Sequence, residues 1–411
     1  MSSKTNAVCA IDFDCVKHLA FTVGNNNSGA SALTQQLADC LKNKGFSKVI
    51  IAMESTSVYS THIACFLSTA PELVPYHAEV YCLNAKTVAN YKKSYIGIGK
   101  TDPIDAFIIA DFARVGRIDG KPWRGSQFLA LQRLTRHRLH LAQSIAREKS
   151  YMMTNIFLKF SELALDTDSK PFSDNFGATA EAVLKEFLST EDIINLSAQE
   201  LIAFVNDKGH GRFADPEHTA LLLRQAAQNS YRLDKCLYEP LTISIASSFN
   251  CLSAFEREIK TIDKAIIKAV KGLNPVEYQC LISIPGIGPV FAAGILAEIG
   301  TMANFQSENS LAKYAGLYWN RPQSGDFTAD ETHLSKAGNS YLRYYLTEAA
   351  NSIRNRDSTY NAFYRKKYSE ATTHHHTRAI ALTARKLVRL IFGLLDKNQL
   401  YSPDKAGGTM E

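Results

Sequence analysis

The sequence predicts an α/β domain followed by helical domains. Over residues 1–120, short β-rich runs alternate with helical patterns, which is typical of a mixed sheet covered by helices. The middle of the chain carries long helical patterns, and the last third is helical to about Lys397. We therefore expect an α/β domain over 1–120, a helical coiled-coil region over 121–275, an all-α domain over 276–397 and a disordered tail over 398–411.

The first 120 residues contain the elements of a mixed α/β sheet. AVCAIDFD and KHLAFTVG are β-rich and nearly adjacent, which favours a hairpin. SALTQQLADCLKNKGF is helical and is expected to end at Gly45. A strand, a helix and another strand follow in KVIIAMES, STHIACFLS and AEVYCLN, and KTDPIDAFIIADFAR opens a further helix.

The middle region predicts two long helices with an insert between them. A helix rich in Arg and His covers 128–160, and an insert of shorter helices and turns covers about 161–239. The next helix is expected to begin at Pro240, because proline is tolerated at a first helical position. Its apolar or small residues alternate in spacing between 4 and 3, which is a coiled-coil seam: Leu241, Ile245, Ser248, Leu252, Phe255, Ile259, Ile262 and Ile266. The partner is either the 128–160 helix or another subunit.

The last third begins with IPGIG (284–288) between two apolar helical stretches, a pattern that resembles a helix-hairpin-helix. Gly286 and Gly288 would let backbone N–H groups approach a phosphate, and the next helix would add its N-terminal dipole. The alternative is an ordinary Pro-Gly turn between helices.

Composition excludes several classes of protein. The chain is 45% hydrophobic and 21% charged, and it has no run of eighteen apolar residues, so no membrane partner is expected. The start, MSSKTNAVCAIDFD, lacks the pattern of a signal peptide. The eight cysteines are scattered without zinc-ligand spacing, which favours reduced thiols in a cytoplasmic protein.

Positive charge is concentrated near the carboxyl end. The net charge is +6, and residues 341–397 alone hold eleven Lys/Arg against four Asp/Glu, a net of +7. Aromatic residues separate these charges in YNAFYRKKY (360–368), which suits a polyanion such as nucleic acid. A solvated helical face is the alternative. The histidines at 374–376 cannot all face one ion on a helix, so a solvated patch or a nucleic-acid contact is favoured over a metal site.

Four acidic residues form the most informative pattern. Asp12 and Glu54 end apolar strands, where ligands bind in open α/β folds, and Asp102 and Asp105 share one face of a helix. Asp111 is rotated off that face. Helix capping by Thr101 or Asp102 explains one acid but not four acids from three elements. Converging carboxylates require cations between them, so the pattern predicts Mg²⁺ or Mn²⁺ and phosphoryl-transfer chemistry.

These motifs resemble the DEDD transposases of the insertion-sequence families 110 and 1111, which include Piv-type DNA invertases. The resemblance rests on AIDFD, AMESTSVYSTHI and KTDPIDAFIIADFAR, and it covers about 1–120 and 275–395. It implies an RNase H-like domain of the RuvC type whose metal ligands are Asp12, Glu54, Asp102 and Asp105. Two departures are Lys17, which follows Asp12 later than usual, and Pro103, where a basic residue is common.

The resemblance continues in P-G-I-G, G-L, S-G and S-K-x-G-N-x-x-L-R, which occur here in the family's order. It implies that Ser324 is the catalytic nucleophile, with Ser335 as the alternative. It also implies that Lys336, Asn339 and Arg343 contact phosphate or the transition state. A further departure is Trp319, where the family often has proline.

The function implied is a recombinase of a mobile element that cuts and rejoins DNA through a phosphoserine link. The resemblance also implies a bridge RNA that pairs with donor and target DNA, a dimer of dimers with composite sites, and a prokaryotic, nucleoid-associated location. Three alternatives remain. A RuvC-like, junction-resolving nuclease would use water instead of a serine. An actin-like kinase would need glycine-rich phosphate loops, which are absent from 1–120. A DNA-architectural protein would not need the four acids.

Overall fold

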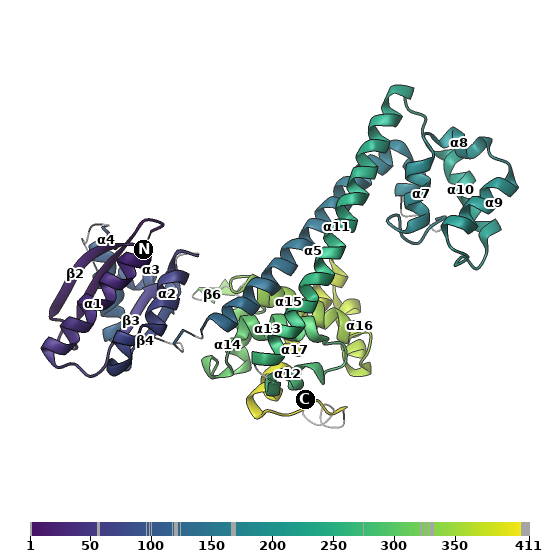
Figure 1. The fold of residues 1–411 in the computed structure, drawn as a ribbon. Coiled ribbons are helices and arrows are strands. Elements are labelled where there is room, and N and C mark those ends of the chain that lie inside the picture. The colour runs from purple at the N-terminus through teal and green to yellow at the C-terminus, as the bar shows by residue number, and fades with distance from the viewer. Residues whose placement is uncertain are drawn as a thin grey trace. The chain divides into compact units, whose positions relative to one another are not determined.

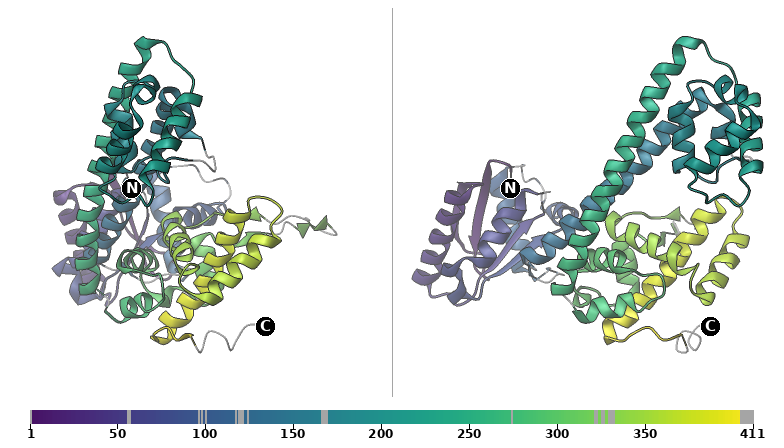
Figure 2. Two further views of the ribbon diagram at one scale, coloured as in Figure 1. Left: turned by 90° about the vertical axis from the view of Figure 1, so that its right-hand side faces the viewer. Right: turned by 45° about the vertical axis from the view of Figure 1, so that its right-hand side comes forward.

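The chain divides into two units, whose helices and strands are drawn in Figures 1 and 2. One unit combines residues 1–133 with 269–411, and the other is residues 134–268. The structure is a computed structural model, and it describes residues 2–55, 58–95, 97, 99, 101–116, 118, 122–123, 125–165, 170–273, 275–320, 323–324, 327–328 and 333–403.

The amino-terminal part of the first unit is an α/β domain. Its elements are β1 (Thr5–Ile11), β2 (Lys17–Gly24), α1 (Asn27–Lys44), β3 (Ile50–Glu54), α2 (Tyr59–Thr69), the 3₁₀ helix η1 (Pro71–Tyr76), β4 (Glu79–Leu83), α3 (Ala85–Lys92) and α4 (Asp102–Arg114). β1 pairs with β2 as the predicted antiparallel hairpin, and β3 pairs with β4 in parallel. α1 ends at Gly45, as predicted, with φ of 71° in the left-handed region that glycine adopts without strain.

Helices cover both faces of these strands. Successive strand residues point to opposite faces, and β3 shows the consequence. Ile51 and Met53 pack in a core with α1 and α2, whereas Ala52 packs in a second core around Leu83, Val88 and Phe112, which includes α3 and α4. The expected α/β character is therefore confirmed.

The second unit is built on two long helices, α5 (Ser126–Lys159) and α11 (Lys235–Leu273), which run side by side in Figures 1 and 2. All eight predicted seam residues of α11 are buried or half-buried. Arg138 Nε of α5 lies 2.6 Å from Asp263 Oδ1 of α11. Of the two partners that the sequence left open, the chain's own α5 is therefore one. The prediction that Pro240 begins α11 is wrong, because the helix begins five residues earlier at Lys235. A proline this close to the start breaks a single bond, the one to the carbonyl of residue 236.

Between the long helices lies the predicted insert of short helices. They are α6 (Ser161–Ala164), α7 (Ala178–Glu186), α8 (Thr190–Asn195), α9 (Ala198–Lys208) and α10 (Pro216–Asn229). Ser189 and Ser197 begin α8 and α9 with capping boxes, which satisfy the free N–H groups of the first turn. The insert shares one apolar core with α5 and α11, in which Ile156, Leu184 and Ile245 have no exposed surface.

The carboxy-terminal part of the first unit is mostly helical. Its elements are α12 (Pro275–Ile282), α13 (Pro289–Ile299), the 3₁₀ helix η2 (Met302–Asn304), α14 (Glu308–Ala315), β5 (Trp319–Asn320), β6 (Gln323–Ser324), β7 (Phe327–Thr328), β8 (His333–Leu334), α15 (Ser340–Ile353), α16 (Ser358–Glu370) and α17 (His375–Lys397). The prediction of an all-α domain is corrected by the four short strands, which pair β5 with β8 and β6 with β7. Two-residue strands carry too short a pattern to be detected in sequence.

Part of the segment expected to be a disordered tail is hydrogen-bonded. The Tyr401 amide donates to Ser283 Oγ at 2.8 Å, and the Tyr401 hydroxyl donates to Asp357 Oδ2 at 2.5 Å. Residues 404–411 lie outside the described residues. Within the part of the chain that the structure describes, no helix has the length and apolarity needed to cross a bilayer.

Candidate functional site

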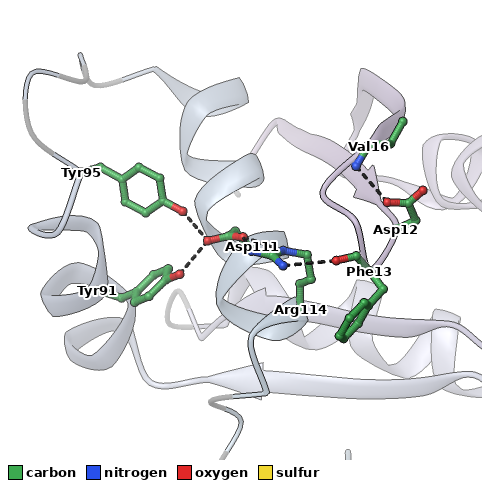
Figure 3. Close-up of polar contacts among 7 residues, drawn as sticks. All are labelled: Asp12, Phe13, Val16, Tyr91, Tyr95, Asp111 and Arg114. Carbon is green, nitrogen blue, oxygen red and sulfur yellow. Dashed lines mark hydrogen bonds and ion pairs between the residues drawn. The ribbon is translucent and has the colours of Figure 1, made fainter.

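Asp12 is the first of the four predicted acids and directly follows β1. Its Oδ1 accepts a hydrogen bond from the Val16 amide at 2.8 Å (Figure 3), and its Oδ2 lies 2.9 Å from His18 Nε2. The bonds from His18 and Val16 lower the pKa of Asp12. Asp12 therefore holds the turn between β1 and β2 together while remaining ionised at neutral pH.

Glu54 and the α4 acids come from neighbouring elements. Glu54 is the last residue of β3 and shares a strand face with Ala52, whose core includes α3 and α4. Asp102 and Asp105 lie in the first turn of α4, as predicted, and Thr101 is the N-cap residue without a side-chain capping bond. Asp102 is exposed, and Asp105 is half-buried against the ammonium of Lys92.

The four acids supply the oxygen ligands that Mg²⁺ and Mn²⁺ prefer, so the donor set fits a divalent cation. Their elements are adjacent, because α4 packs on both β1 and β3. Within the described residues, however, no three His, Cys, Asp or Glu side chains are arranged to hold a metal ion together. His18 and Lys92 contact two of the four carboxylates instead. The metal-binding role of the four acids stays a prediction.

Asp111 has a structural environment that the sequence did not reveal. Only 5% of its surface is exposed. Tyr91 donates to Oδ2 at 2.6 Å, Tyr95 donates to the same oxygen, and Arg114 Nε donates to Oδ1 at 2.8 Å (Figure 3). Burial alone would raise the pKa of Asp111, but the bonds from the two tyrosines and the arginine outweigh it and lower the pKa.

Arg114 connects this cluster to the Asp12 turn. Its Nη1 donates to the carbonyl of Phe13 at 3.2 Å, one residue after Asp12. The helical spacing of Tyr91 and Tyr95, together with Arg114 three residues after Asp111, was the signal available in the sequence.

Ser324 lies in a short strand of the domain that the sequence predicted to be all-α. It is the second residue of β6 and pairs with Phe327 of β7, while residues 325 and 326 between them lie outside the described residues. β5 and β8 pair on either side of this segment, with Trp319 opposite Leu334. Ser335, the alternative nucleophile, continues that ladder by donating its amide to the Tyr318 carbonyl at 2.9 Å.

The G-L and S-K-x-G-N-x-x-L-R motifs contact each other where the chain enters β5 and where it leaves β8. Gly316 ends α14 with φ of 69°, and a Cβ there would meet the Arg343 guanidinium. A Cβ on Gly338 would lie 2.5 Å from the Tyr314 carbonyl and 2.7 Å from the Gly316 amide. Gly316 is therefore favoured by its left-handed backbone, and Gly338 is required by close approach of the backbone. The Asn339 amide donates to the Tyr314 carbonyl at 2.6 Å.

The three predicted phosphate contacts differ in availability. Asn339 caps α15 through the amides of Tyr341 and Leu342, and its Nδ2 donates to Glu298 Oε2 at 2.7 Å. Arg343 Nη1 donates to the carbonyls of Ala315 at 3.1 Å and Lys336 at 2.9 Å. Lys336 itself is exposed, with φ of 52°. The structure thus assigns scaffold contacts to Asn339 and Arg343 and leaves Lys336 open to solvent.

The two glycines of the IPGIG turn also differ. Gly286 has φ of 94°, and a Cβ there would lie 2.9 Å from the Ile353 amide nitrogen at the end of α15. Glycine is therefore needed at position 286 because the turn packs closely on α15. Gly288 is the N-cap of α13, without a side-chain capping bond, and a Cβ there would meet no atom within 4 Å.

Cations lie over aromatic rings in the basic carboxy-terminal region. The Arg354 guanidinium lies 4.4 Å from the centre of the Tyr364 ring, and Lys386 Nζ lies 4.7 Å from the centre of the Phe363 ring. Within the histidine run, His376 Nδ1 lies 2.7 Å from the Tyr364 hydroxyl. Some of the charges and aromatics that alternate in the sequence therefore pack against one another where the end of α15, α16 and α17 meet, and Tyr364 is buried there.

Comparison with known proteins identifies the family. A model described as "Transposase", for DEDD transposases of the IS110 type, matches residues 1–157, and one described as "Transposase IS116/IS110/IS902 family" matches residues 278–365. The 42 kDa protein of insertion element IS900 from Mycobacterium paratuberculosis is 28% identical over 323 residues, 77% of each chain. The 44.8 kDa protein of insertion element IS116 from Streptomyces clavuligerus is 24% identical over 332 residues, 80% of each chain. A probable family 20 transposase of Pseudomonas aeruginosa is 26% identical over 155 residues, 37% of this chain and 44% of that protein. The chain belongs to the IS110 family of DEDD transposases.

Proposed function

We propose that this transposase cuts and rejoins DNA through a covalent phosphoserine intermediate formed by Ser324, with a divalent cation held by Asp12, Glu54, Asp102 and Asp105. The observation that carries the proposal is the position of the Ser-Gly motif. Ser324 lies on a short strand whose flanking strands, β5 and β8, are paired. A nucleophile needs such a fixed position, because orientation contributes a large part of catalysis.

Residues of the family's motifs hold together the two ends of the segment that contains β5 to β8, which we call the strand arm. Gly316 and Gly338 allow the end of α14 and the start of α15 to touch, and Arg343 bonds to carbonyls of both segments. In this proposal the G-L and S-K-x-G-N-x-x-L-R motifs hold the arm in place. Of the predicted phosphate contacts, Lys336 is the exposed one and is assigned to the DNA backbone.

In the first chemical step, the Ser324 oxygen forms a bond to a scissile phosphorus while the bond from that phosphorus to a deoxyribose oxygen breaks. The serine loses one proton and the leaving deoxyribose oxygen takes up one, so the step is balanced. The phosphoserine diester conserves the energy of the broken bond. A deoxyribose hydroxyl of another strand then attacks the same phosphorus and releases the serine, which rejoins the DNA.

A divalent cation, Mg²⁺ or Mn²⁺, would supply positive charge where negative charge develops on the phosphoryl oxygens. The chain's own contribution is to hold four acids on adjacent elements of an RNase H-like domain of the RuvC type. Asp12 is kept ionised by its hydrogen bonds, as a metal ligand must be.

DNA would follow the basic carboxy-terminal surface and the IPGIG turn, used as a helix-hairpin-helix. The start of α13 at Gly288 is open and has no side-chain cap, so backbone N–H groups there can meet a phosphate. The cations over aromatic rings on α15, α16 and α17 would add phosphate contacts.

Three further parts of the proposal follow from the family resemblance. A bridge RNA pairs with element ends and target DNA, so base pairing selects the sites. The active form is a tetramer, a dimer of dimers, in which the serine of one subunit completes the acidic site of another. The enzyme works in the prokaryotic cytoplasm, at the nucleoid.

The test is a search for the covalent intermediate. The full chain with its co-purified RNA is incubated with DNA carrying element ends and Mg²⁺, and protein–DNA adducts are mapped by mass spectrometry. The expected adduct is on Ser324, is lost in Ser324→Ala and Asp102→Asn, and persists in the matched control Ser335→Ala. Metal-dependent cleavage without an adduct, unchanged in Ser324→Ala, would refute the proposal in favour of a junction-resolving nuclease.

A further inference from the structure

One half of the long helix α11 carries a line of exposed cations. Their side chains point to solvent along five successive positions of the carboxy-terminal half: Arg257, Lys260, Lys264, Lys268 and Lys271. We call these five residues the α11 basic face. The first four belong to the second unit, and Lys271 continues the same helix.

Helical geometry places the five residues on one narrow side. At 3.6 residues per turn, they fall within an arc of about 80° and extend over about 21 Å of helix. The seam residues Ile259, Ile262 and Ile266 lie on the opposite side, about 170° away by the same rotation. The basic face is therefore directed away from the apolar seam.

The charge pattern differs from that of an ordinary solvated helix face, which mixes both signs. No acidic residue falls within the arc between Arg257 and Lys271. Among the described residues, Arg257 pairs with Glu258 at 3.5 Å, whereas the four lysines make no ion pair. Between residues 243 and 253, the same side carries the uncharged residues Ile243, Ala246, Asn250 and Ser253, and the first turns of the helix carry Lys235 and Glu239 there.

We propose that the α11 basic face binds the phosphate backbone of double-stranded DNA. A rigid line of about one cation per helical turn suits a polymer with evenly spaced negative charges. Lysine acts as a point charge without base-specific geometry, so the contact positions the duplex without reading its sequence. Duplex DNA is favoured over RNA because the family acts on DNA.

This inference rests on DNA as the substrate and not on the chemistry of Ser324. The test therefore uses Ser324→Ala as the background, in EDTA, so that binding is measured without cleavage. Fluorescence anisotropy of a duplex of arbitrary sequence is recorded over a series of KCl concentrations. The comparison variant is the triple substitution Lys260→Gln, Lys264→Gln, Lys268→Gln.

The triple variant is expected to lower the slope of log K against log salt by about 2.7 if each lysine engages one phosphate, since each contact contributes about 0.9. If wild type and variant bind equally at 1 M KCl, a slope difference of about 2.7 over the tenfold change to 0.1 M KCl lowers the variant's affinity by up to about 500-fold. Replacing the three lysines with arginine keeps the charges and should preserve the slope.

The matched control removes three exposed lysines elsewhere, Lys4, Lys42 and Lys44, and changes the net charge equally. Its slope should stay at the wild-type value. Equal losses in both triple variants would overturn the proposal, because they would reflect net charge alone. An unchanged slope in the α11 triple would also overturn it. The proposal would also be overturned if the α11 triple variant lost affinity for structured RNA while its affinity for duplex DNA was unchanged.

Discussion

Lys159 at the end of α5 provides a sharp test of how burial controls charge in this protein. Only 3% of the residue is exposed, and its Nζ donates to the carbonyls of Leu184 and Phe187 and to Thr242 Oγ1, each at 2.7 Å. Burial lowers the pKa of Lys159 from 10.5 to about 8, and Asp192 partly opposes this shift. The ammonium thus joins α5 to the end of α7 and to α11 at a cost in desolvation.

The perturbation is Lys159→Met, studied as a function of pH. Since the folded pKa lies below the unfolded value, the unfolded chain binds more protons between about pH 8 and 10.5, and the lysine's contribution to stability rises with pH through that window. The shift corresponds to about 3 kcal/mol, at about 1.36 kcal/mol for each pKa unit. The stability of the wild type relative to Lys159→Met should therefore increase by about 3 kcal/mol from pH 7.5 to 10.5.

The assay is urea unfolding of the full chain by pulse proteolysis, with mass mapping of residues 134–268. Lys235→Met serves as control, because Lys235 belongs to the same unit and is exposed, so this variant removes a lysine without removing a buried charge. A pH-independent difference between wild type and Lys159→Met would refute the reasoning. It would mean that the three acceptors compensate fully for the burial of the charge.

Three further perturbations follow from the geometry. Gly294→Ala would place a Cβ 2.5 Å from the ring of the fully buried Tyr345, so thermal unfolding of the carboxy-terminal part should show a loss of about 1–3 kcal/mol; an unchanged melting temperature would contradict this packing. Asn339→Asp keeps a capping oxygen but sets a carboxylate against the buried Glu298, so it should destabilise more than Asn339→Ala, and the reverse order in urea unfolding would contradict the assigned contact. Asp111→Asn should cost about 3 kcal/mol at pH 7, and because the folded pKa of Asp111 is lowered, its difference from wild type should vanish as the pH falls through that pKa; a difference that stays constant in acid would argue against the ion pair.

Local sequence signals predicted the regular elements of this fold well. β2 covers the segment expected from KHLAFTVG, and α1 ends at Gly45, because strand alternation and a left-handed glycine are local properties. Pro240 was misleading, because a proline near a helix start breaks so few bonds that tertiary packing decides where the helix begins. The strands β5 to β8 have two residues each, too short for an alternating pattern, and β5 and β8 are defined only by pairing across the residues between them.

The candidate site was predictable to a similar extent. The sequence placed Asp12 after the first strand and both α4 acids in the first helical turn, as the structure has them. It could not separate contacts that build the scaffold from contacts left for a ligand. Asn339 is the clearest case. Its capping of α15 is local, but its bond to Glu298 joins residues 41 positions apart in the chain.

The joint between Gly316 and Gly338 has a consequence for how this segment can diversify. Because the two ends of the segment are fixed to each other, the helices on either side do not depend on how many residues lie between them. The entropy lost on closing such a loop grows only with the logarithm of its length, at about 0.6 kcal/mol for each doubling. Insertions between β7 and β8 should therefore cost little free energy of folding. The segment that carries Ser324 can then acquire new contacts to nucleic acid while the helices on either side stay unchanged.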